Sequence, residues 1–287
     1  MTSTTDRMRG QSTTPVALCD LLDDMEVIIR PDALAAARLA AHLIASELEE
    51  QRDLVLGLAT GRTMEAVYQQ LVDLHETEEL DFSACQTFNL DEYVGLSPDD
   101  AHSYRHYMDE HFFNRVNIDR RNTHLPNGMA ADLDAECRHY EQLMRDAGGI
   151  DVQLLGIGRS GHIGFNEPLS ALRSRTRVKA LTRQTIEQNA PLFGNRELVP
   201  QRAITMGVGT IMDSARAVLL ATGSEKAGIV ATAVEGPITA MISATALQLH
   251  PRCTVIVDEG AAANLKGSEY YRWIFESEPE WERYRDL

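Results

Sequence analysis

The stretch "DLVLGLATGRTMEAV" (residues 53–67) decides the fold. Residues 53–58 form a short apolar run that predicts a buried strand, and a helical pattern follows from about Met64. The turn between them, residues 59–63, contains a glycine that lets the backbone reverse tightly. A strand joined by a short turn to a helix is the repeating unit of a parallel sheet.

The same pattern recurs along the chain. Further strands are predicted at 85–90, 151–157, 202–208, 216–222 and 253–258, and helices at 31–50, 133–148, 225–236 and 238–250. This alternation predicts an α/β fold with an open, mostly parallel sheet and helices on both faces, similar to a Rossmann fold. With no linker or repeat in sight, we expect one domain over residues 26–287. The Ser/Thr-rich residues 1–25 are expected to form a disordered tail.

Composition excludes several classes of function. The chain has 27 Lys and Arg against 43 Asp and Glu, a net charge of −16, which disfavours nucleic acid and anionic membranes as partners. The 4 cysteines are scattered without a CxxC pair, which disfavours a zinc site or a disulfide framework. With no recognisable signal peptide and no apolar run long enough for a bilayer, we expect a cytoplasmic protein.

Ligands of such sheets bind beyond the carboxyl ends of the strands, so the turns there carry the candidate site. The turn after the first quoted strand holds Thr60, Gly61, Arg62 and Thr63. The free N–H groups at the start of the following helix suit a phosphate. The GK[ST] ending of a Walker motif is missing, and an ordinary strand–helix turn is an equally open interpretation.

A second turn of this kind follows the strand at 216–222, with Lys226 in the first helical turn. A lysine there opposes the helix dipole by about 0.3–1 kcal/mol, and a bound anion would remove the conflict. A solvated surface lysine is the alternative.

Two carboxylates follow the strand at 85–90, in "FNLDEYVGL" (88–96). Adjacent side chains of an extended chain point to opposite sides, so at most one of Asp91 and Glu92 faces a given pocket. A carboxylate in this position could remove a proton next to a carbonyl, or it could simply cap a turn.

The stretch "GIGRSGHIGFNEP" (156–168) follows the strand at 151–157. Its four glycines allow the chain to pass close to a ligand. His162 can exchange protons near neutral pH, and Glu167 beside it would fix its tautomer and favour its charged form. A turn histidine with a satisfied hydrogen bond is the alternative.

Taken together, the segments resemble the glucosamine-6-phosphate deaminase (isomerase) family. The resemblance covers about residues 26–266 and rests on these pieces in order: "FNLDEYVGL", "GHIGFNEP", "SRTRVKALT", "MGVGTIMD", "GSEKA", "AVEG" and "LQLHP". It implies conversion of glucosamine 6-phosphate and water to fructose 6-phosphate and ammonia, without metal or organic cofactor.

The resemblance also implies residue roles. Asp91 matches the base that moves a proton from C2 to C1 of the open sugar. His162 matches the acid/base that opens the pyranose ring, and Glu167 matches the carboxylate that supports it. The loop Thr60–Thr63 and Lys226 match the phosphate cradle.

Two positions depart from the family pattern. Ser160 stands where relatives usually have Asp, so the charge on His162 should depend more on Glu167. Pro191, in the segment that matches a mobile lid (182–195), stands where relatives carry a phosphate-binding arginine. We consider that Arg62 replaces that charge, and an Arg62 that points to solvent is the alternative.

Some members of the family are regulated by an amino-sugar phosphate at a subunit interface. Ser170, Arg177 and Lys179 match positions used there, but Ala180 replaces a threonine and the aromatic partner differs. These residues could equally be a solvated face. A homo-oligomer is expected.

Other functions remain open. The substrate could be another amino-sugar phosphate, such as galactosamine 6-phosphate. The chain could instead be a hydrolase similar to 6-phosphogluconolactonase, or a sugar-phosphate sensor without activity. The family pieces around Asp91 and Glu167 favour the deaminase, because the lactonase reaction needs no C2 base.

Overall fold

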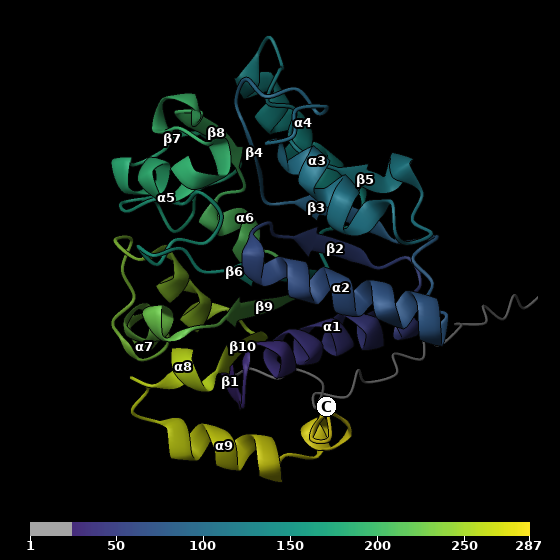
Figure 1. The fold of residues 1–287 in the computed structure, drawn as a ribbon, viewed down its shortest axis with the longest axis vertical. Helices are drawn as coiled ribbons and strands as arrows, with labels where there is room; N and C mark the ends of the chain where they lie inside the picture. Colours follow the sequence, from purple (N-terminus) through teal and green to yellow (C-terminus); the bar gives the residue numbers. More distant parts are fainter. Residues whose placement is uncertain (1–24) are drawn as a thin grey trace, which may run out of the picture.

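The centre of the molecule is a parallel sheet of seven strands (Figure 1). The structure is a computed structural model that describes residues 25–287. The strands lie in the order β1 (Met25–Arg30), β10 (Cys253–Asp258), β9 (Arg216–Ala221), β6 (Val152–Gly156), β2 (Val55–Leu58), β3 (Gln86–Asn89) and β5 (Thr123–His124). Every pair is parallel, which confirms the predicted fold class.

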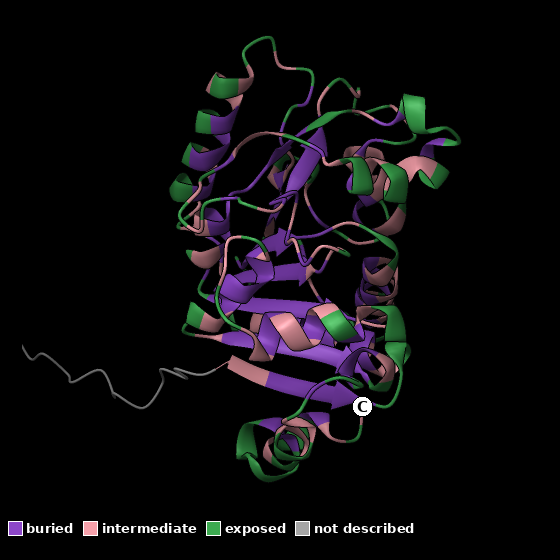
Figure 2. Ribbon diagram, turned by 90° about the vertical axis from the view of Figure 1, so that its left-hand side faces the viewer, coloured by how far each residue is buried: buried purple, intermediate pink, exposed green. Residues whose placement is uncertain are grey.

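Helices cover both faces of this sheet, and Figure 2 shows the buried strands between them. The α-helices of the described residues are α1 (Ala33–Glu50), α2 (Arg62–Glu78), α3 (Tyr104–Met108), α4 (Leu133–Asp146), α5 (Arg183–Phe193), α6 (Val208–Met212), α7 (Ala227–Glu235), α8 (Glu259–Ala262) and α9 (Ser268–Ser277), of which α5 packs with the second sheet described below. The longest, α1, starts where the Asp32 carboxylate accepts a hydrogen bond from the Ala35 N–H, 2.8 Å away. Its buried Ala, Leu and Ile residues join the main core.

A second sheet lies above the central one in Figure 1, with α5 beside it. Its three strands are antiparallel, in the order β4 (Asp91–Tyr93), β8 (Arg202–Thr205) and β7 (Arg177–Ala180). The prediction that 202–208 belongs to the parallel sheet was therefore wrong. Ala203 of that run packs into a separate small core with Tyr93, Phe165 and Phe193, whereas Met206 joins the main core.

Two other predictions need correction. The helix expected at 238–250 is a 3₁₀ segment, Ser243–Leu249, because the Thr245 hydroxyl bonds the carbonyls of Thr239 and Ile242 and competes with helical pairing. The tail expected over 1–25 falls outside the described residues except for Met25, which begins β1.

The order of the strands positions the site. From β2 the chain builds β3 and β5 on one side, and then β6, β9 and β10 on the other. The order therefore reverses between β2 and β6, and the crevice at such a reversal is where open α/β sheets bind ligands. The four neighbouring strands β9, β6, β2 and β3 are the ones whose terminal turns carry the predicted site residues.

Candidate active site

The structure brings the predicted catalytic groups to one edge of the sheet. Asp91 lies just beyond β3, and His162 and Glu167 lie in the loop beyond β6. Gly164 shows how close they come, since a Cβ built on it would lie 3.4 Å from Oδ2 of Asp91 and 2.9 Å from Oγ1 of Thr205. Its φ of +54° also favours glycine. Gly164 therefore lets the histidine loop pass directly over Asp91.

Asp91 is nearly buried, with 6% of its surface exposed. Burial, with a smaller contribution from the charge of Glu92, raises the pKa of Asp91 to about 8. A carboxyl whose pKa lies near the working pH can both accept and return a proton.

Glu92 points away from Asp91, as expected for neighbours in an extended chain. Its carboxylate accepts hydrogen bonds from the backbone N–H groups of Tyr93 at 2.8 Å and of Tyr104 and Arg105 at 3.0 Å each. Those donors belong to β4 and to the start of α3. Glu92 thus binds the backbone of β4 and of the first turn of α3. Asp91 is the carboxylate of this pair that faces the histidine loop.

His162, Ser160 and Glu167 form one hydrogen-bonded group. Nδ1 of His162 lies 2.7 Å from the Ser160 hydroxyl and 3.4 Å from Oε2 of Glu167. Both oxygens lie at Nδ1, so Nε2 is the ring nitrogen left for the substrate. A serine hydroxyl and a glutamate carboxylate therefore share the same ring nitrogen.

The other oxygen of Glu167, Oε1, is held by residues that the sequence did not indicate. It accepts hydrogen bonds from the Thr182 N–H at 3.2 Å, from the Thr182 hydroxyl at 3.1 Å and from the Thr185 hydroxyl. Burial opposes the charge of Glu167, but the hydrogen bonds from His162, Thr185 and Thr182 outweigh it and lower the pKa to about 2. Glu167 is therefore ionised at neutral pH.

The predicted phosphate loop opens α2. Gly61 is the N-cap, with a φ of +116° and no side chain to cap the first N–H groups, so these remain available to an anion. The Tyr107 hydroxyl donates a hydrogen bond to the Gly61 carbonyl at 2.9 Å. Arg62 is exposed and Thr63 is half-buried.

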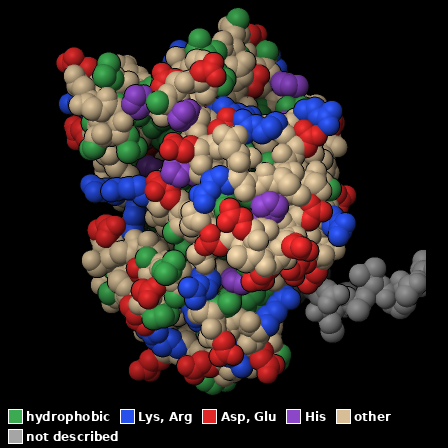
Figure 3. Space-filling model, turned by 45° about the vertical axis from the view of Figure 1, so that its right-hand side comes forward, with side chains coloured by type: hydrophobic (Ala, Val, Ile, Leu, Met, Phe, Trp, Pro, Cys, Tyr) green, Lys and Arg blue, Asp and Glu red, His purple; other side chains and the backbone are tan. Residues whose placement is uncertain are grey.

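Lys226 lies against the histidine loop rather than in open solvent. It is half-buried, and its Nζ donates a hydrogen bond to the Ile157 carbonyl at 2.8 Å. Burial lowers its pKa. The turns that follow β9 and β6 therefore contact each other through this lysine. Figure 3 shows basic side chains beside a recess in the surface.

Pro191 lies inside α5, close to its C-terminal end. Proline has no N–H, so one helical hydrogen bond is missing there. At the preceding turn, Asn189 donates a hydrogen bond to the Tyr93 hydroxyl at 2.8 Å, and Tyr93 contacts the Tyr104 hydroxyl at 3.3 Å. Residues 182–195 are thus joined through Asn189 to Tyr93 of β4 and to Tyr104 of α3.

Ser170 and Arg177 are also brought together. The Arg177 guanidinium donates to the Ser170 hydroxyl at 3.0 Å and to Oδ1 of Asn166 at 2.9 Å. Burial lowers the pKa of Arg177. Lys179 lies two residues further along β7, on the same face, and is half-buried. Through these two hydrogen bonds, Arg177 joins β7 to the loop that carries Glu167.

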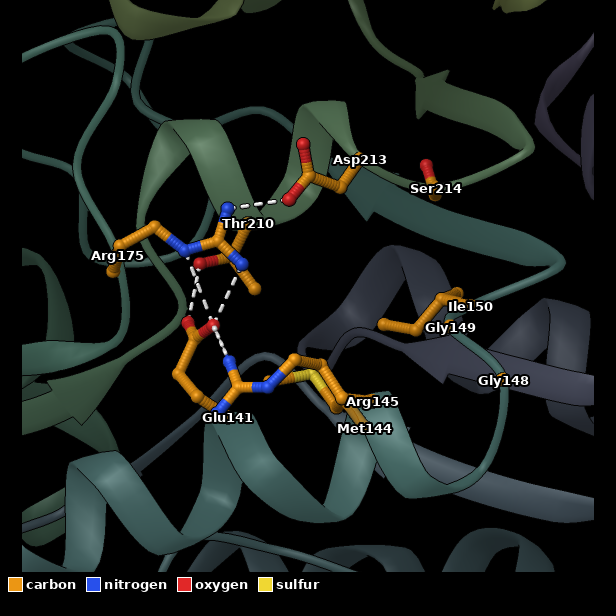
Figure 4. Close-up of a pocket in the computed structure, with 10 residues that line it drawn as sticks. All are labelled: Glu141, Met144, Arg145, Gly148, Gly149, Ile150, Arg175, Thr210, Asp213 and Ser214. Carbon is orange, nitrogen blue, oxygen red and sulfur yellow. Dashed lines mark hydrogen bonds and ion pairs between the residues drawn. The ribbon is translucent and has the colours of Figure 1, made fainter.

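A separate pocket lies between α4 and α6 (Figure 4). Glu141 accepts hydrogen bonds from the hydroxyls of Thr176 at 2.7 Å and Thr210 at 2.6 Å, and from Nη2 of Arg175 at 2.7 Å. Arg175 also pairs with Asp213. The charges of this pocket neutralise one another, and its lining includes none of the predicted site residues.

Within residues 25–287, no cluster of His, Cys, Asp or Glu side chains has the arrangement needed to hold a metal ion. None of the helices in that part of the chain is both long and apolar enough to cross a bilayer.

The fold and site define an α/β protein in which a buried carboxyl group and a histidine lie at the strand ends, together with an uncapped helix N-terminus and a lysine. The family described as glucosamine-6-phosphate isomerases/6-phosphogluconolactonase matches residues 31–255, and this chain belongs to that family. The predicted resemblance is thereby confirmed.

Individual relatives agree with this assignment. The chain is 49% identical over 258 residues to a glucosamine-6-phosphate deaminase of Arthrobacter sp. (strain FB24), covering 90% of this chain and 99% of the relative. It is 50% identical over 250 residues to one of Cellvibrio japonicus, covering 87% and 95%.

Solved structures extend the comparison. A structure described as a monomeric glucosamine-6-phosphate deaminase is 47% identical, with a TM-score of 0.82, covering 84% of this chain and 100% of that one. The 6-phosphogluconolactonase of Thermotoga maritima is 18% identical, with a TM-score of 0.67, covering 82% and 100%, and shares the fold.

Proposed function

We propose that this protein is a glucosamine-6-phosphate deaminase, which converts glucosamine 6-phosphate and water to fructose 6-phosphate and ammonia. The observation that carries the proposal is the position of Asp91 under the loop that holds His162, Ser160 and Glu167. Asp91 and His162 do not share a partner, so each can carry out its own proton transfer. Relatives at about half identity carry the same name.

The first transfer opens the sugar ring. The phosphate is held at Thr60–Thr63 and Lys226, which places the ring over the histidine loop. Nε2 of His162 accepts the proton of the O1 hydroxyl and delivers it to O5 as the C1–O5 bond breaks, which gives the aldehyde. Glu167 stabilises the charged ring of His162 from the Nδ1 side, and the Ser160 hydroxyl shares that nitrogen.

The second transfer moves a proton between neighbouring carbons. Asp91 takes the proton from C2, a proton of the substrate's ammonium group passes to O1, and Asp91 returns its proton to C1, which leaves a C1 hydroxyl and an iminium at C2. Water adds to that carbon, and ammonia leaves as the C2 ketone of fructose 6-phosphate forms. The ammonium group of the arriving substrate favours the ionised form of Asp91, which burial disfavours in the empty site.

The direct test is to incubate the pure protein with glucosamine 6-phosphate and measure ammonia and fructose 6-phosphate together. We expect equimolar products, and none from Asp91→Asn. Release of neither product by a folded protein that binds sugar phosphates would contradict the proposal, and galactosamine 6-phosphate would be tested next.

Two other classes are less well supported. A lactone hydrolase needs no base at C2, yet a buried carboxyl lies at the histidine loop. A sensor needs no histidine with a dedicated carboxylate partner. Hydrolysis of 6-phosphogluconolactone, measured in the same preparation, separates the first from the deaminase.

A second anion site at Ser170, Arg177 and Lys179 also belongs to this proposal. Arg177 contacts Asn166 and Ser170, both neutral, and has no carboxylate within ion-pair distance among the described residues, which leaves its charge available. Activation by a non-reactive amino-sugar phosphate, lost in Arg177→Gln, is the test.

Homo-oligomer formation and a cytoplasmic location stay predictions. A relative of known structure is described as monomeric, so light scattering on the purified protein decides the first. The cysteines of the described part, Cys85, Cys137 and Cys253, are buried and unpaired, which is typical of a reducing compartment.

A further inference from the structure

Arg159 lies in the turn that connects the phosphate lysine with the catalytic histidine. This turn, residues 158–162, is closed by hydrogen bonds from the Gly158 N–H to the His162 carbonyl at 2.8 Å and from the Gly161 N–H to the Gly158 carbonyl at 3.0 Å. The carbonyl of Ile157, just before it, binds Lys226. Arg159 therefore stands two residues after the lysine contact and one residue before Ser160.

The charge of Arg159 is available to a ligand. Its side chain is exposed, and no described residue forms an ion pair or side-chain hydrogen bond with it. It lies on a short turn that backbone hydrogen bonds close at both ends. An arginine without a carboxylate partner beside a strand-end site is suited to an anionic group of the substrate.

Arg159 lies two residues after the backbone carbonyl that binds Nζ of Lys226 at 2.8 Å. After burial, which is the main cause, the charge of Arg159 contributes to the lowered pKa of Lys226, while Glu225 acts in the opposite direction. Two neighbouring cations, one of them half-buried, are unfavourable until an anion lies between them. A phosphate dianion would remove that repulsion and would gain charge-assisted hydrogen bonds from both groups.

We propose that Arg159 binds the phosphate of the substrate together with Lys226, and that it is a specificity residue for phosphorylated sugars. The proposal rests on the function proposed above. It also gives the phosphate a direct connection to the turn that carries Ser160 and His162. The binding of the phosphate by Arg159 and Lys226 does not require Arg62, which lies in the first turn of α2.

The test compares Arg159→Gln with Arg159→Lys and with Arg138→Gln. Arg138 is an exposed arginine on α4, outside the site, and its replacement makes the same change in net charge. We expect Arg159→Gln to raise the KM for glucosamine 6-phosphate by about 10-fold or more, with a smaller change in kcat. Arg159→Lys should recover most of the loss, and Arg138→Gln should match the wild type.

Binding is measured independently of turnover, as the thermal stabilisation by inorganic phosphate and by fructose 6-phosphate. Arg159→Gln should have the wild-type Tm without ligand but a smaller shift with either probe. An unphosphorylated sugar, glucosamine, should inhibit the wild type and Arg159→Gln equally.

The outcomes separate the two proposals. An active wild type with unchanged KM and phosphate stabilisation in Arg159→Gln would overturn the role of Arg159 and leave the deaminase function standing. A wild type that binds phosphate through Arg159 but releases no ammonia would overturn the function and support the binding site. A wild type that binds neither probe and is inactive would overturn both.

Discussion

Oε2 of Glu167 faces Nδ1 of His162 at 3.4 Å, while Oε1 of the same carboxylate is held by the first turn of α5. The carboxylate therefore supports the histidine on one side and is itself positioned by the lid segment on the other. Its full charge at neutral pH follows from these donors, which lower its pKa to about 2 against the effect of burial.

Glu167→Gln should slow ring opening. The amide cannot stabilise a charged His162, so we expect kcat to fall by about 10- to 100-fold with little change in KM. Stability should respond to pH as well. Because the folded pKa is lower than the unfolded value near 4.5, the contribution of Glu167 is present above that value and is lost as pH falls toward 2.

Thermal unfolding of the wild type and Glu167→Gln between pH 7 and 2.5 measures this. The difference in Tm should shrink as the solution becomes more acidic. A difference that does not change with pH would contradict the assignment.

Asp91→Asn should abolish turnover while making the fold more stable. The pKa of Asp91 is raised to about 8 by burial and by Glu92, so the unfolded chain releases this proton well below the pH at which the folded protein does. Between about pH 4 and 8 the wild type therefore loses stability with rising pH, and the amide does not.

We expect Asp91→Asn to melt at higher temperature than the wild type at pH 8 and to approach it at pH 4, with kcat reduced by about 100-fold or more. A variant that is less stable at both pH values would show that Asp91 is ionised in the empty site.

Ser160→Ala should lower kcat moderately. It removes the partner that lies 2.7 Å from Nδ1 of His162, while Glu167 remains. We expect a loss of about 3- to 10-fold, in line with one hydrogen bond. Ser160→Thr keeps the hydroxyl and should keep most of the activity; equal losses in both variants would mean that the contact has no role in turnover.

Gly164→Ala should damage the site more than the fold. The residue has a positive φ, and its Cβ would lie 2.9 Å from Oγ1 of Thr205 and 3.4 Å from Oδ2 of Asp91. Gly148→Ala is the matched control, because its φ of +96° imposes similar strain and its Cβ meets nothing within 4 Å.

Both glycine variants should lose about 1 kcal/mol of stability. Only Gly164→Ala should lose activity, measured as ammonia release at saturating substrate. Equal activity in the two would show that Asp91 does not depend on the loop above it.

The main sheet and the catalytic groups could be predicted from sequence because both depend on local signals. Apolar runs such as 53–58 predict strands, and parallel strands place their terminal turns at one edge, so Asp91, His162 and Lys226 were expected at one end of the sheet. The opposed directions of Asp91 and Glu92 followed from the geometry of an extended chain.

What escaped prediction depends on contacts between distant segments. Thr182 and Thr185 bind Glu167 across 15 and 18 residues, and a pair of threonines at a helix start is an ordinary capping pattern. The second sheet has strands of three or four residues whose pairing follows from the small core around Tyr93. Arg159 was missed because one arginine in a glycine-rich turn has no distinctive spacing.

The two ends of α5 are held differently, and this limits how a lid can open. Its first turn is fixed to the buried carboxylate of Glu167, whereas Pro191 removes a hydrogen bond from its last turn. Opening motions should therefore start at the exposed Leu192 end and proceed toward the threonines. We expect such an opening to unwind only that helix end and to leave Glu167 in place against His162.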